Sequence, residues 1–267
     1  MLSNLHSHTT FCDGNNTPEE MVIIAIEKGF SSFGFSGHAI TDFDLSYCMK
    51  DTEEYIKTIQ CLKEKYKDKI QVYLGIEEDA FSPIKYRDNF DYIIGSLHYF
   101  KIDGEYYPVD LSVESFNKTF ELFSGNISAM AENYYSNFCD YILKRKPDII
   151  GHFDLLTKYD ERNTFALREN AKYNKIAEKY LKIALKSDCF FEVNTGAISR
   201  NWRTSPFPDE NLLYILKKEN GKLIINSDTH NTNTLDNYFN ETRKLLKSIG
   251  FQYIFTLYNN EFIKDYL

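Results

Sequence analysis

The chain has 267 residues, 43% of them hydrophobic, so it can bury one large core, and we expect a single domain over residues 1–267. Its net charge of −8, with no basic run longer than Lys144-Arg145-Lys146, argues against a nucleic-acid partner. No stretch approaches the roughly 20 uninterrupted apolar residues that span a bilayer, and the N-terminal residues lack the pattern of a signal peptide. We therefore expect a cytoplasmic protein with no membrane partner.

The five cysteines are odd in number and form no Cys-x-x-Cys pair. This pattern argues against a disulfide framework and against a cysteine zinc site. We expect reduced and mostly buried thiols at Cys12, Cys48, Cys61, Cys139 and Cys189.

Strand-like and helix-like patterns alternate along the chain. The first helix is predicted to begin at the capping box Thr17-Pro18-Glu19-Glu20 and to end at Gly29. Apolar periodicity predicts further helices near residues 55–66, 177–185, 209–220 and 239–250, and apolar runs predict strands at 71–77, 91–97, 147–152, 189–194 and 222–227. Repeated βα units of this kind imply a parallel sheet, either closed as a barrel or open.

The segment between His98 and Pro147 departs from this alternation. Residues 99–146 are predicted to form a loop with one or two helices and no strand. We expect this insertion to lie near the mouth of the active site, because barrel enzymes build their sites from the loops at one end.

All six histidines lie at the ends of short apolar, strand-like runs. Chance would place some of them on helix surfaces, so this grouping predicts one site assembled from several strands, as in parallel barrels. Taken singly, any one of them could instead be a hydrogen-bonded core histidine. The six are His6, His8, His38, His98, His152 and His230.

Two motifs place pairs of candidate ligands on one strand face. In His6-Ser7-His8 the two imidazoles project together, because side chains at i and i+2 of a strand share a face. The alternative for this motif alone is a solvent-exposed pair. Asp228-Thr229-His230 repeats the geometry near the other end of the chain. Since the first and last strands of a closed barrel are neighbours, we expect the two motifs to converge.

Two further carboxylates complete the candidate site. Glu77 ends a strand, where it could bridge two cations, and strand alternation places Glu78 on the opposite side. The alternative is an acidic trio with Asp79 on a solvated loop. Asp13 follows closely after His8, although Asp-Gly is also a common turn pair.

The count of candidate ligands suits three divalent metal ions, because one catalytic zinc takes about three protein ligands. Imidazole and carboxylate without thiolate suit zinc, iron or manganese. The nine predicted ligands are His6, His8, Asp13, His38, Glu77, His98, His152, Asp228 and His230.

The ordered motifs H-x-H, Asp-Gly, G-H, G-x-E, S-L-H, G-H-x-D and S-D-x-H run from His6 to His230. This order resembles the polymerase and histidinol phosphatase (PHP) family. The resemblance implies an α/β fold, a distorted (β/α)7 TIM-like barrel, with a trinuclear metal centre whose ligand positions match the nine residues above. Two positions depart from the pattern. Ala39 stands where many members carry an acidic residue, and many histidinol phosphatases have a histidine one position after the counterpart of Asp13.

Within the family, the stretch Glu192-Val193-Asn194-Thr195-Gly196 followed by Arg200 resembles the histidinol-phosphate phosphatase branch. The resemblance implies that Arg162 and Arg200 hold the substrate phosphate. A guanidinium suits this role because its planar fork donates two parallel hydrogen bonds. The alternative is that both arginines form surface ion pairs, and Lys158 and Arg203 are the next candidates.

We therefore expect a metal-dependent phosphomonoesterase that resembles enzymes hydrolysing L-histidinol phosphate to L-histidinol and phosphate in histidine biosynthesis. Bound cations would lower the pKa of a water that attacks phosphorus in line, while the arginines neutralise the phosphate oxygens. The leaving alkoxide needs a proton, for which His230 and the Asp228 carboxyl are the candidates.

Three alternatives remain open. The chain could be a PHP phosphoesterase for another small phosphate ester, such as a sugar phosphate or a nucleotide. It could be an amidohydrolase-type barrel that cleaves C–N bonds, although such barrels usually carry a bridging lysine and no lysine here ends a predicted strand in the right place. It could also be a non-catalytic module that holds structural metal, against which the intact ligand set argues. The expected partner is a small phosphorylated substrate.

Overall fold

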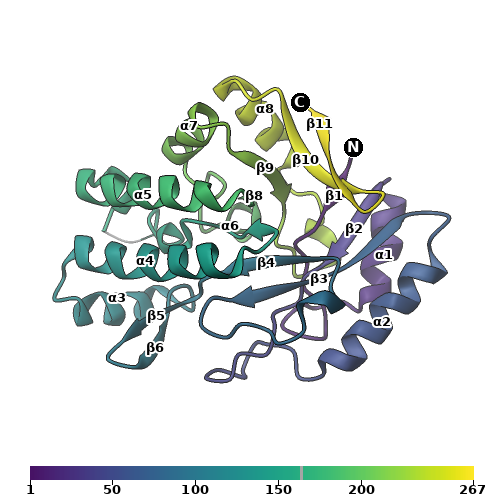
Figure 1. The fold of residues 1–267 in the computed structure, drawn as a ribbon, viewed down its shortest axis with the longest axis horizontal. Helices are drawn as coiled ribbons and strands as arrows, with labels where there is room; N and C mark the ends of the chain where they lie inside the picture. Colours follow the sequence, from purple (N-terminus) through teal and green to yellow (C-terminus); the bar gives the residue numbers. More distant parts are fainter. Residues whose placement is uncertain (163–164) are drawn as a thin grey trace.

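Seven parallel strands form a nearly closed barrel in the computed structural model, which describes residues 1–162 and 165–267 (Figure 1). Neighbouring strands follow the order β1-β2-β3-β4-β7-β8-β9, and each pairing is parallel. The predicted distorted (β/α)7 barrel is therefore confirmed. The strands are β1 (Ser3–Asn4), β2 (Ser32–Phe35), β3 (Gln71–Asp79), β4 (Tyr92–Ser96), β7 (Ile149–Ile150), β8 (Phe190–Asn194) and β9 (Lys222–Asn226).

The barrel closes between the segments that follow β1 and β9. The His8 amide donates to the Thr229 carbonyl at 2.8 Å, and the Thr229 amide donates to the His6 carbonyl at 3.2 Å. One step below, the Leu5 amide donates to Asn226 Oδ1 at 2.8 Å. The two ends of the sequence therefore lie side by side, as the paired motifs predict.

Helices pack around the outside of the strands (Figure 1). The predicted capping box of the first helix is confirmed, since Glu20 N donates to Thr17 Oγ1 at 3.3 Å and Thr17 N donates to Glu20 Oε2 at 2.8 Å. The helices are α1 (Pro18–Glu27), α2 (Thr52–Lys65), α3 (Val113–Leu122), α4 (Ile127–Arg145), α5 (Ala171–Ala184), α6 (Gly196–Ser199), α7 (Glu210–Lys218) and α8 (Phe239–Ile249), with short 3₁₀ helices at Arg87–Asn89, Leu155–Thr157, Leu167–Glu169, Leu185–Ser187 and Thr232–Thr234.

Tyr92 fills the barrel interior below the strand ends that carry the histidines. Its hydroxyl donates to the Phe35 carbonyl at 3.0 Å. A Cβ added at Gly34 would lie 2.4 Å from the Tyr92 hydroxyl, and one added at Gly75 would lie 2.2 Å from the ring. Both positions therefore require glycine, because the strand backbone approaches the ring too closely for a side chain.

The insertion at 99–146 contains two strands, so the expectation of a segment without strands was wrong. β5 (Tyr99–Ile102) pairs antiparallel with β6 (Glu105–Pro108) through a two-residue turn at Asp103-Gly104. Both turn residues have positive φ, 51° and 90°, which is the backbone that two-residue hairpins favour and that Asp-Gly supplies. The helices α3 and α4 that follow agree with the prediction.

A second hairpin at the C-terminus was not predicted. β10 (Tyr253–Tyr258) pairs antiparallel with β11 (Glu261–Tyr266) through Asn259 and Asn260, which also have positive φ. Phe262 stacks on Phe190, the first residue of β8, with ring centroids 4.3 Å apart. The hairpin therefore packs against the end of the barrel opposite to the histidines.

The cysteines are free thiols, three of them buried, with Cys12 partly buried and Cys61 exposed. This agrees with the expectation of reduced and mostly buried thiols. In the described part of the chain, none of the helices combines the length and apolarity needed to cross a bilayer.

Candidate active site

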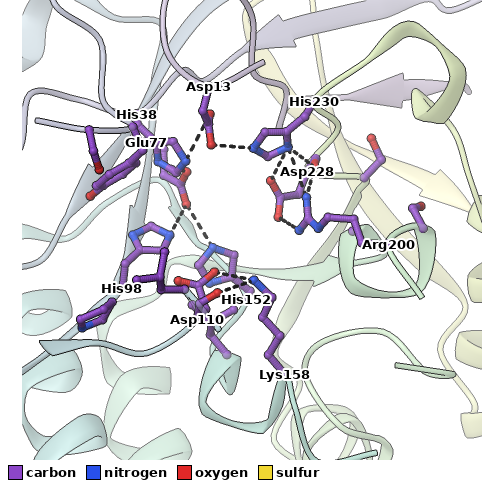
Figure 2. Close-up of a pocket in the computed structure, with 18 of the residues that line it drawn as sticks. Asp13, His38, Glu77, His98, Asp110, His152, Lys158, Arg200, Asp228 and His230 are labelled. Carbon is purple, nitrogen blue, oxygen red and sulfur yellow. Dashed lines mark hydrogen bonds and ion pairs between the residues drawn. The ribbon is translucent and has the colours of Figure 1, made fainter. Parts of the chain in front are cut away.

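The nine predicted metal ligands converge at the carboxyl ends of the barrel strands. Figure 2 shows those that line the cavity, namely Asp13, His38, Glu77, His98, His152, Asp228 and His230. Because parallel strands end at the same rim, a side chain just beyond each strand faces one common space. Their ligand atoms form four overlapping groups, with the atoms of each group within 4.8 Å of one another. The groups are His8, Asp13, His38 and His230; His6, His8 and Asp228; His6, Glu77 and His152; and His38, Glu77 and His98.

Glu77 lies at the centre of this arrangement. Its Oε2 is 2.9 Å from His38 Nδ1 and 3.3 Å from His6 Nε2. Its Oε1 is 3.1 Å from His152 Nε2 and 3.4 Å from His98 Nε2. Oε2 also lies 3.5 Å from His8 Nε2. The two carboxylate oxygens therefore face different sets of imidazoles, a placement that suits the predicted bridging of two cations.

Glu78 points away from the histidines. Its carboxylate accepts hydrogen bonds from the Tyr141 hydroxyl at 2.8 Å and from Arg145 Nη2 at 3.1 Å, both on helix α4. The two neighbouring glutamates thus lie on opposite faces of β3, in agreement with the predicted register.

Asp13 reaches the site from the loop after β1. Its Oδ2 is 3.2 Å from His230 Nε2, and its Oδ1 is 3.6 Å from His8 Nδ1. A Cβ added at Gly14 would lie 2.4 Å from the His8 backbone, so glycine lets the loop fold back against the strand. The turn at Asp13-Gly14 therefore places the Asp13 carboxylate at its predicted ligand position, so the two interpretations of this pair are compatible.

Asp228 is held in an unusual backbone conformation. Its φ is +48°, in the left-handed region that costs energy for residues other than glycine. In this conformation Oδ1 lies 3.2 Å from His8 Nε2, and Oδ2 accepts from Arg200 Nη2 at 2.8 Å. A Cβ added at Gly196 would come within 3.0 Å of Oδ2. The packing around Asp228 therefore fixes the direction of its carboxylate.

The chemistry of these groups fits divalent cations. Among the described residues, His6 Nε2, His8 Nε2 and Glu77 Oε2 are buried without a hydrogen-bond partner, and the two imidazole nitrogens lie 3.3 and 3.5 Å from that oxygen. Buried polar atoms are nearly always satisfied, so unpartnered atoms aimed at one another call for a ligand between them. Imidazole and carboxylate in this number are the donors that zinc, iron and manganese accept.

The electrostatics of the site divide the ligands by protonation state. Burial, together with the neighbouring His230 and His38, lowers the pKa of His8 to about 3, so this imidazole is neutral and able to ligate. Burial alone would raise the pKa of Glu77, but the imidazoles of His6 and His38 hold it well below its ordinary value. Burial alone would lower the pKa of His6, His38 and His98, but neighbouring carboxylates, Glu77 among them, raise it. Because metal ligands must be neutral imidazoles and ionised carboxylates, metal binding would release protons from these three histidines.

Glu192 supports the site from beneath, a role that the sequence did not reveal. This fully buried carboxylate lies 2.6 Å from His6 Nδ1 and accepts from the His152 amide at 2.9 Å. Asn194 Nδ2 and Asn226 Nδ2 donate to it at 2.9 and 3.0 Å. Such a partner fixes the orientation of a ligating imidazole and strengthens it as a ligand. The available signal was strand alternation, which puts Glu192 and Asn194 on one face.

Glu192→Gln is expected to weaken metal binding about tenfold, at the lower end of the effect of removing such partners, because the amide oxygen can still accept. Competition with a fluorescent chelator measures the change. Glu178→Gln, on the exposed face of α5, serves as the control. An unchanged metal affinity in a folded Glu192→Gln protein would contradict the supporting role.

A cavity of about 540 Å³ opens above the metal groups. Arg200 and Lys158 both line it, and Figure 2 shows them across the cavity from His38. Arg200 is anchored by Asp228, while Lys158 Nζ lies 2.8 Å from Asp110 Oδ2. Lys158, the reserve candidate, therefore has the access expected of a phosphate-binding group.

The structure does not bring the other two cationic candidates to the cavity. Arg162 is exposed, donates to the Asn201 carbonyl at 2.5 Å, and is not among the lining residues. Arg203 is buried, donates to Thr157 Oγ1 at 2.7 Å and lies over the Phe207 ring. Arg203 thus ties the loop after α6 to the rest of the fold.

Comparison with known proteins gives a consistent result. A family model described as PHP domain matches residues 4–196. A Schizosaccharomyces pombe protein described as a probable histidinol-phosphatase is 25% identical, over 92% of this chain and 86% of that protein. The histidinol-phosphatase of Bacillus subtilis is 25% identical, over 84% of this chain and 92% of its own length.

The fold is also shared with a solved structure. The histidinol phosphate phosphatase of Lactococcus lactis, in complex with zinc, L-histidinol and phosphate, superposes with a TM-score of 0.70. The match covers 98% of this chain and 99% of that chain, at 20% sequence identity. At this identity the likeness establishes the shared barrel.

Proposed function

Because the chain belongs to the PHP domain family, we propose that it is a metal-dependent phosphomonoesterase that hydrolyses L-histidinol phosphate to L-histidinol and phosphate. The observation that carries the proposal is the convergence of nine imidazole and carboxylate side chains beneath one cavity that Arg200 and Lys158 also line. The Schizosaccharomyces pombe and Bacillus subtilis relatives are described as a probable histidinol-phosphatase and a histidinol-phosphatase, which supports this choice of substrate.

The metal groups would hold three divalent cations, zinc, iron or manganese, because they contain nine different ligands and one such cation takes about three. When bound, the cations supply Lewis-acid stabilisation of the phosphate and lower the pKa of a water. The bound zinc of the Lactococcus lactis relative supports this choice of metal.

The chain's own residues orient the phosphate. A guanidinium donates through a planar fork that can match two phosphate oxygens, whereas Lys158 adds a point charge. Arg200 Nη1 and Nη2 already donate to Asp228 at 3.1 and 2.8 Å, so a bound phosphate would share these donors. We assign phosphate binding to Arg200 and Lys158, because both side chains line the cavity. Lys158 thus replaces Arg162, the second residue predicted from the sequence.

We assign protonation of the leaving alkoxide to His230 or Asp228, the two side chains predicted for this role. His230 and Asp228 both line the cavity. The side chain of His230 is 23% exposed and that of Asp228 is 10% exposed. His230 is therefore the more accessible of the two to the leaving oxygen, although with a metal held at Nε2 beside Asp13 only its Nδ1 could carry the proton.

The alternative reaction classes have less support from the site. Among the described residues, Lys158 is the one lysine that lines the cavity, and its Nζ pairs with Asp110, which is not a predicted ligand, rather than lying between the metal groups as a bridging lysine of an amidohydrolase would. The cavity beside the metal groups and the cations that line it would serve no purpose in a non-catalytic module.

A panel of phosphate esters tests the proposed substrate. We expect kcat/KM for L-histidinol phosphate to exceed that for glucose 6-phosphate and for AMP by at least about tenfold, because one well-placed contact to a charged group is worth roughly this factor. Initial rates of phosphate release from the metal-loaded enzyme measure it. A higher kcat/KM for either of the other esters would contradict the assignment of L-histidinol phosphate.

A further inference from the structure

The cavity has a second wall, built from the loop after β2 and the hairpin β5–β6. It begins at the metal groups, where the His38 and Tyr47 rings meet edge to face with centroids 4.7 Å apart. Tyr47 lies 6.3 Å from Tyr99, and Tyr99 lies 4.8 Å from Phe43. Tyr47 and Tyr99 line the cavity and define this aromatic wall, while Phe43 contacts Tyr99 without lining the cavity itself.

Asp44 lies on this wall and lines the cavity. Its Oδ2 accepts from the Tyr99 hydroxyl at 2.7 Å, and its Oδ1 accepts from Ser46 N at 3.0 Å and Ser46 Oγ at 2.6 Å. Partial burial raises the pKa of Asp44, but these donors outweigh it and hold the pKa below its ordinary value. The carboxylate is therefore ionised and fixed in position.

Asp44 differs from the other carboxylates that line the cavity. Each of the others faces a cationic side chain or an imidazole, whereas in residues 1–162 and 165–267 no lysine, arginine or histidine lies within ion-pair distance of Asp44. A fixed negative charge without a counter-charge in an enzyme cavity suits a cationic ligand. The other lining carboxylates are Asp13 with His230, Glu77 with His38, Asp110 with Lys158 and Asp228 with Arg200.

We propose that Asp44 is a specificity-determining residue that binds a cationic nitrogen group on the alcohol half of the substrate. The inference rests on the proposed function and adds to it the recognition of the leaving group. In L-histidinol phosphate the amine lies on the carbon next to the ester methylene and the imidazole lies at the end of the molecule opposite to the phosphate, so both basic groups belong to the alcohol half. The cavity offers a matching arrangement, with metal ligands and Arg200 at one place and Asp44 with its aromatic wall at another. The enzyme therefore selects phosphate esters whose alcohol half carries a cationic nitrogen group.

The test is the ratio of kcat/KM for L-histidinol phosphate to kcat/KM for p-nitrophenyl phosphate, which shares the phosphate but lacks a cation. Asp44→Asn should lower this ratio by about tenfold, mainly through KM, since a contact to a partly exposed charge gives the low end of the usual range. Asp42→Asn is the matched control, because Asp42 is an exposed carboxylate in the same loop that does not line the cavity. Equal ratios for Asp44→Asn and the wild type would overturn the proposal.

Tyr99→Phe separates recognition from a structural role. This change removes the hydroxyl that donates to Asp44 but leaves the carboxylate in place. We expect the ratio to stay within about threefold of the wild type, since Ser46 still holds the other carboxylate oxygen. A tenfold fall in Tyr99→Phe as well would mean that Asp44 acts only by holding the wall, and would overturn the proposal.

Two further substrates identify the cationic group. O-phosphoethanolamine carries only the ammonium, and the phosphate ester of 3-(imidazol-4-yl)propanol carries only the imidazole. Asp44→Asn should lower the ratio for one of them, and an effect on neither would overturn the proposal.

Calorimetric measurement of L-histidinol binding to the metal-loaded protein tests the Asp44 subsite independently of the proposed hydrolysis. If L-histidinol phosphate is not hydrolysed, the proposed function fails, while weaker L-histidinol binding by Asp44→Asn would still support the subsite and unchanged binding would overturn it.

Discussion

Replacing Glu77 by glutamine should reduce kcat/KM on the order of a thousandfold. Its two carboxylate oxygens face different sets of imidazoles, so the amide would lose one anionic contact and one unit of charge at the centre of the site. Metal ions contribute several kcal/mol of transition-state stabilisation, and each ~1.4 kcal/mol is a factor of about ten in rate. Elemental analysis should show a parallel loss of metal.

Glu78→Gln is the control for this substitution. It makes the same chemical change one residue away, where the carboxylate contacts Tyr141 and Arg145 instead of histidines. We expect near-normal turnover with a stability loss of about 1 to 2 kcal/mol, because a buried ionic hydrogen bond is removed. Equal losses of turnover in both variants would show that the side chains do not divide between the two faces of β3 as described.

Arg200→Ala should lower kcat/KM for L-histidinol phosphate by about ten- to a hundredfold, since a hydrogen bond to a charged group is worth on the order of 1.5 to 3 kcal/mol. Arg200 also anchors Asp228, so the metal content of the variant must be measured alongside its kinetics. Lysine at position 200 should restore only part of the loss, because a point charge lacks the bidentate fork.

Arg162→Ala tests whether Arg162 binds the phosphate, as the sequence pattern predicts, or lies outside the phosphate site, as the structure indicates. The pattern places both arginines on the phosphate, whereas Arg162 is exposed and lies outside the lining of the cavity. We expect at most a few-fold effect from this change and a larger one from Lys158→Ala. A loss in Arg162→Ala as large as that in Arg200→Ala would return Arg162 to the phosphate site.

The metal groups could be located from the sequence because their positions follow from strand geometry. Histidines at the ends of apolar runs must share a rim if the strands are parallel, and alternation alone distinguishes Glu77 from Glu78. The two ends of the chain were expected to meet because a barrel closes, and Ser7 does pair with Thr229. These conclusions need only local periodicity and one global rule.

The remaining features depend on contacts that periodicity does not encode. Whether Arg162 or Lys158 faces the cavity is decided by the path of an irregular loop, in which Arg162 turns to Asn201 and Lys158 turns to Asp110. Glu192 acts through a histidine 186 positions away in the chain. The Asp103-Gly104 pair is a recognisable turn signal for the hairpin. The prediction nevertheless assigned only loop and helix to residues 99–146, because this segment interrupts the alternation of barrel strands and helices.

The most direct measurement is phosphate release from L-histidinol phosphate as metal is returned to chelator-stripped protein. Activity should be absent without metal and should rise with added zinc, iron or manganese until two to three equivalents are bound, as determined by elemental analysis of the same samples. This outcome follows from nine ligands shared among overlapping groups. Full activity in the stripped protein or at one equivalent would contradict a site of several metals, and no turnover of L-histidinol phosphate by fully loaded protein would contradict the proposed function.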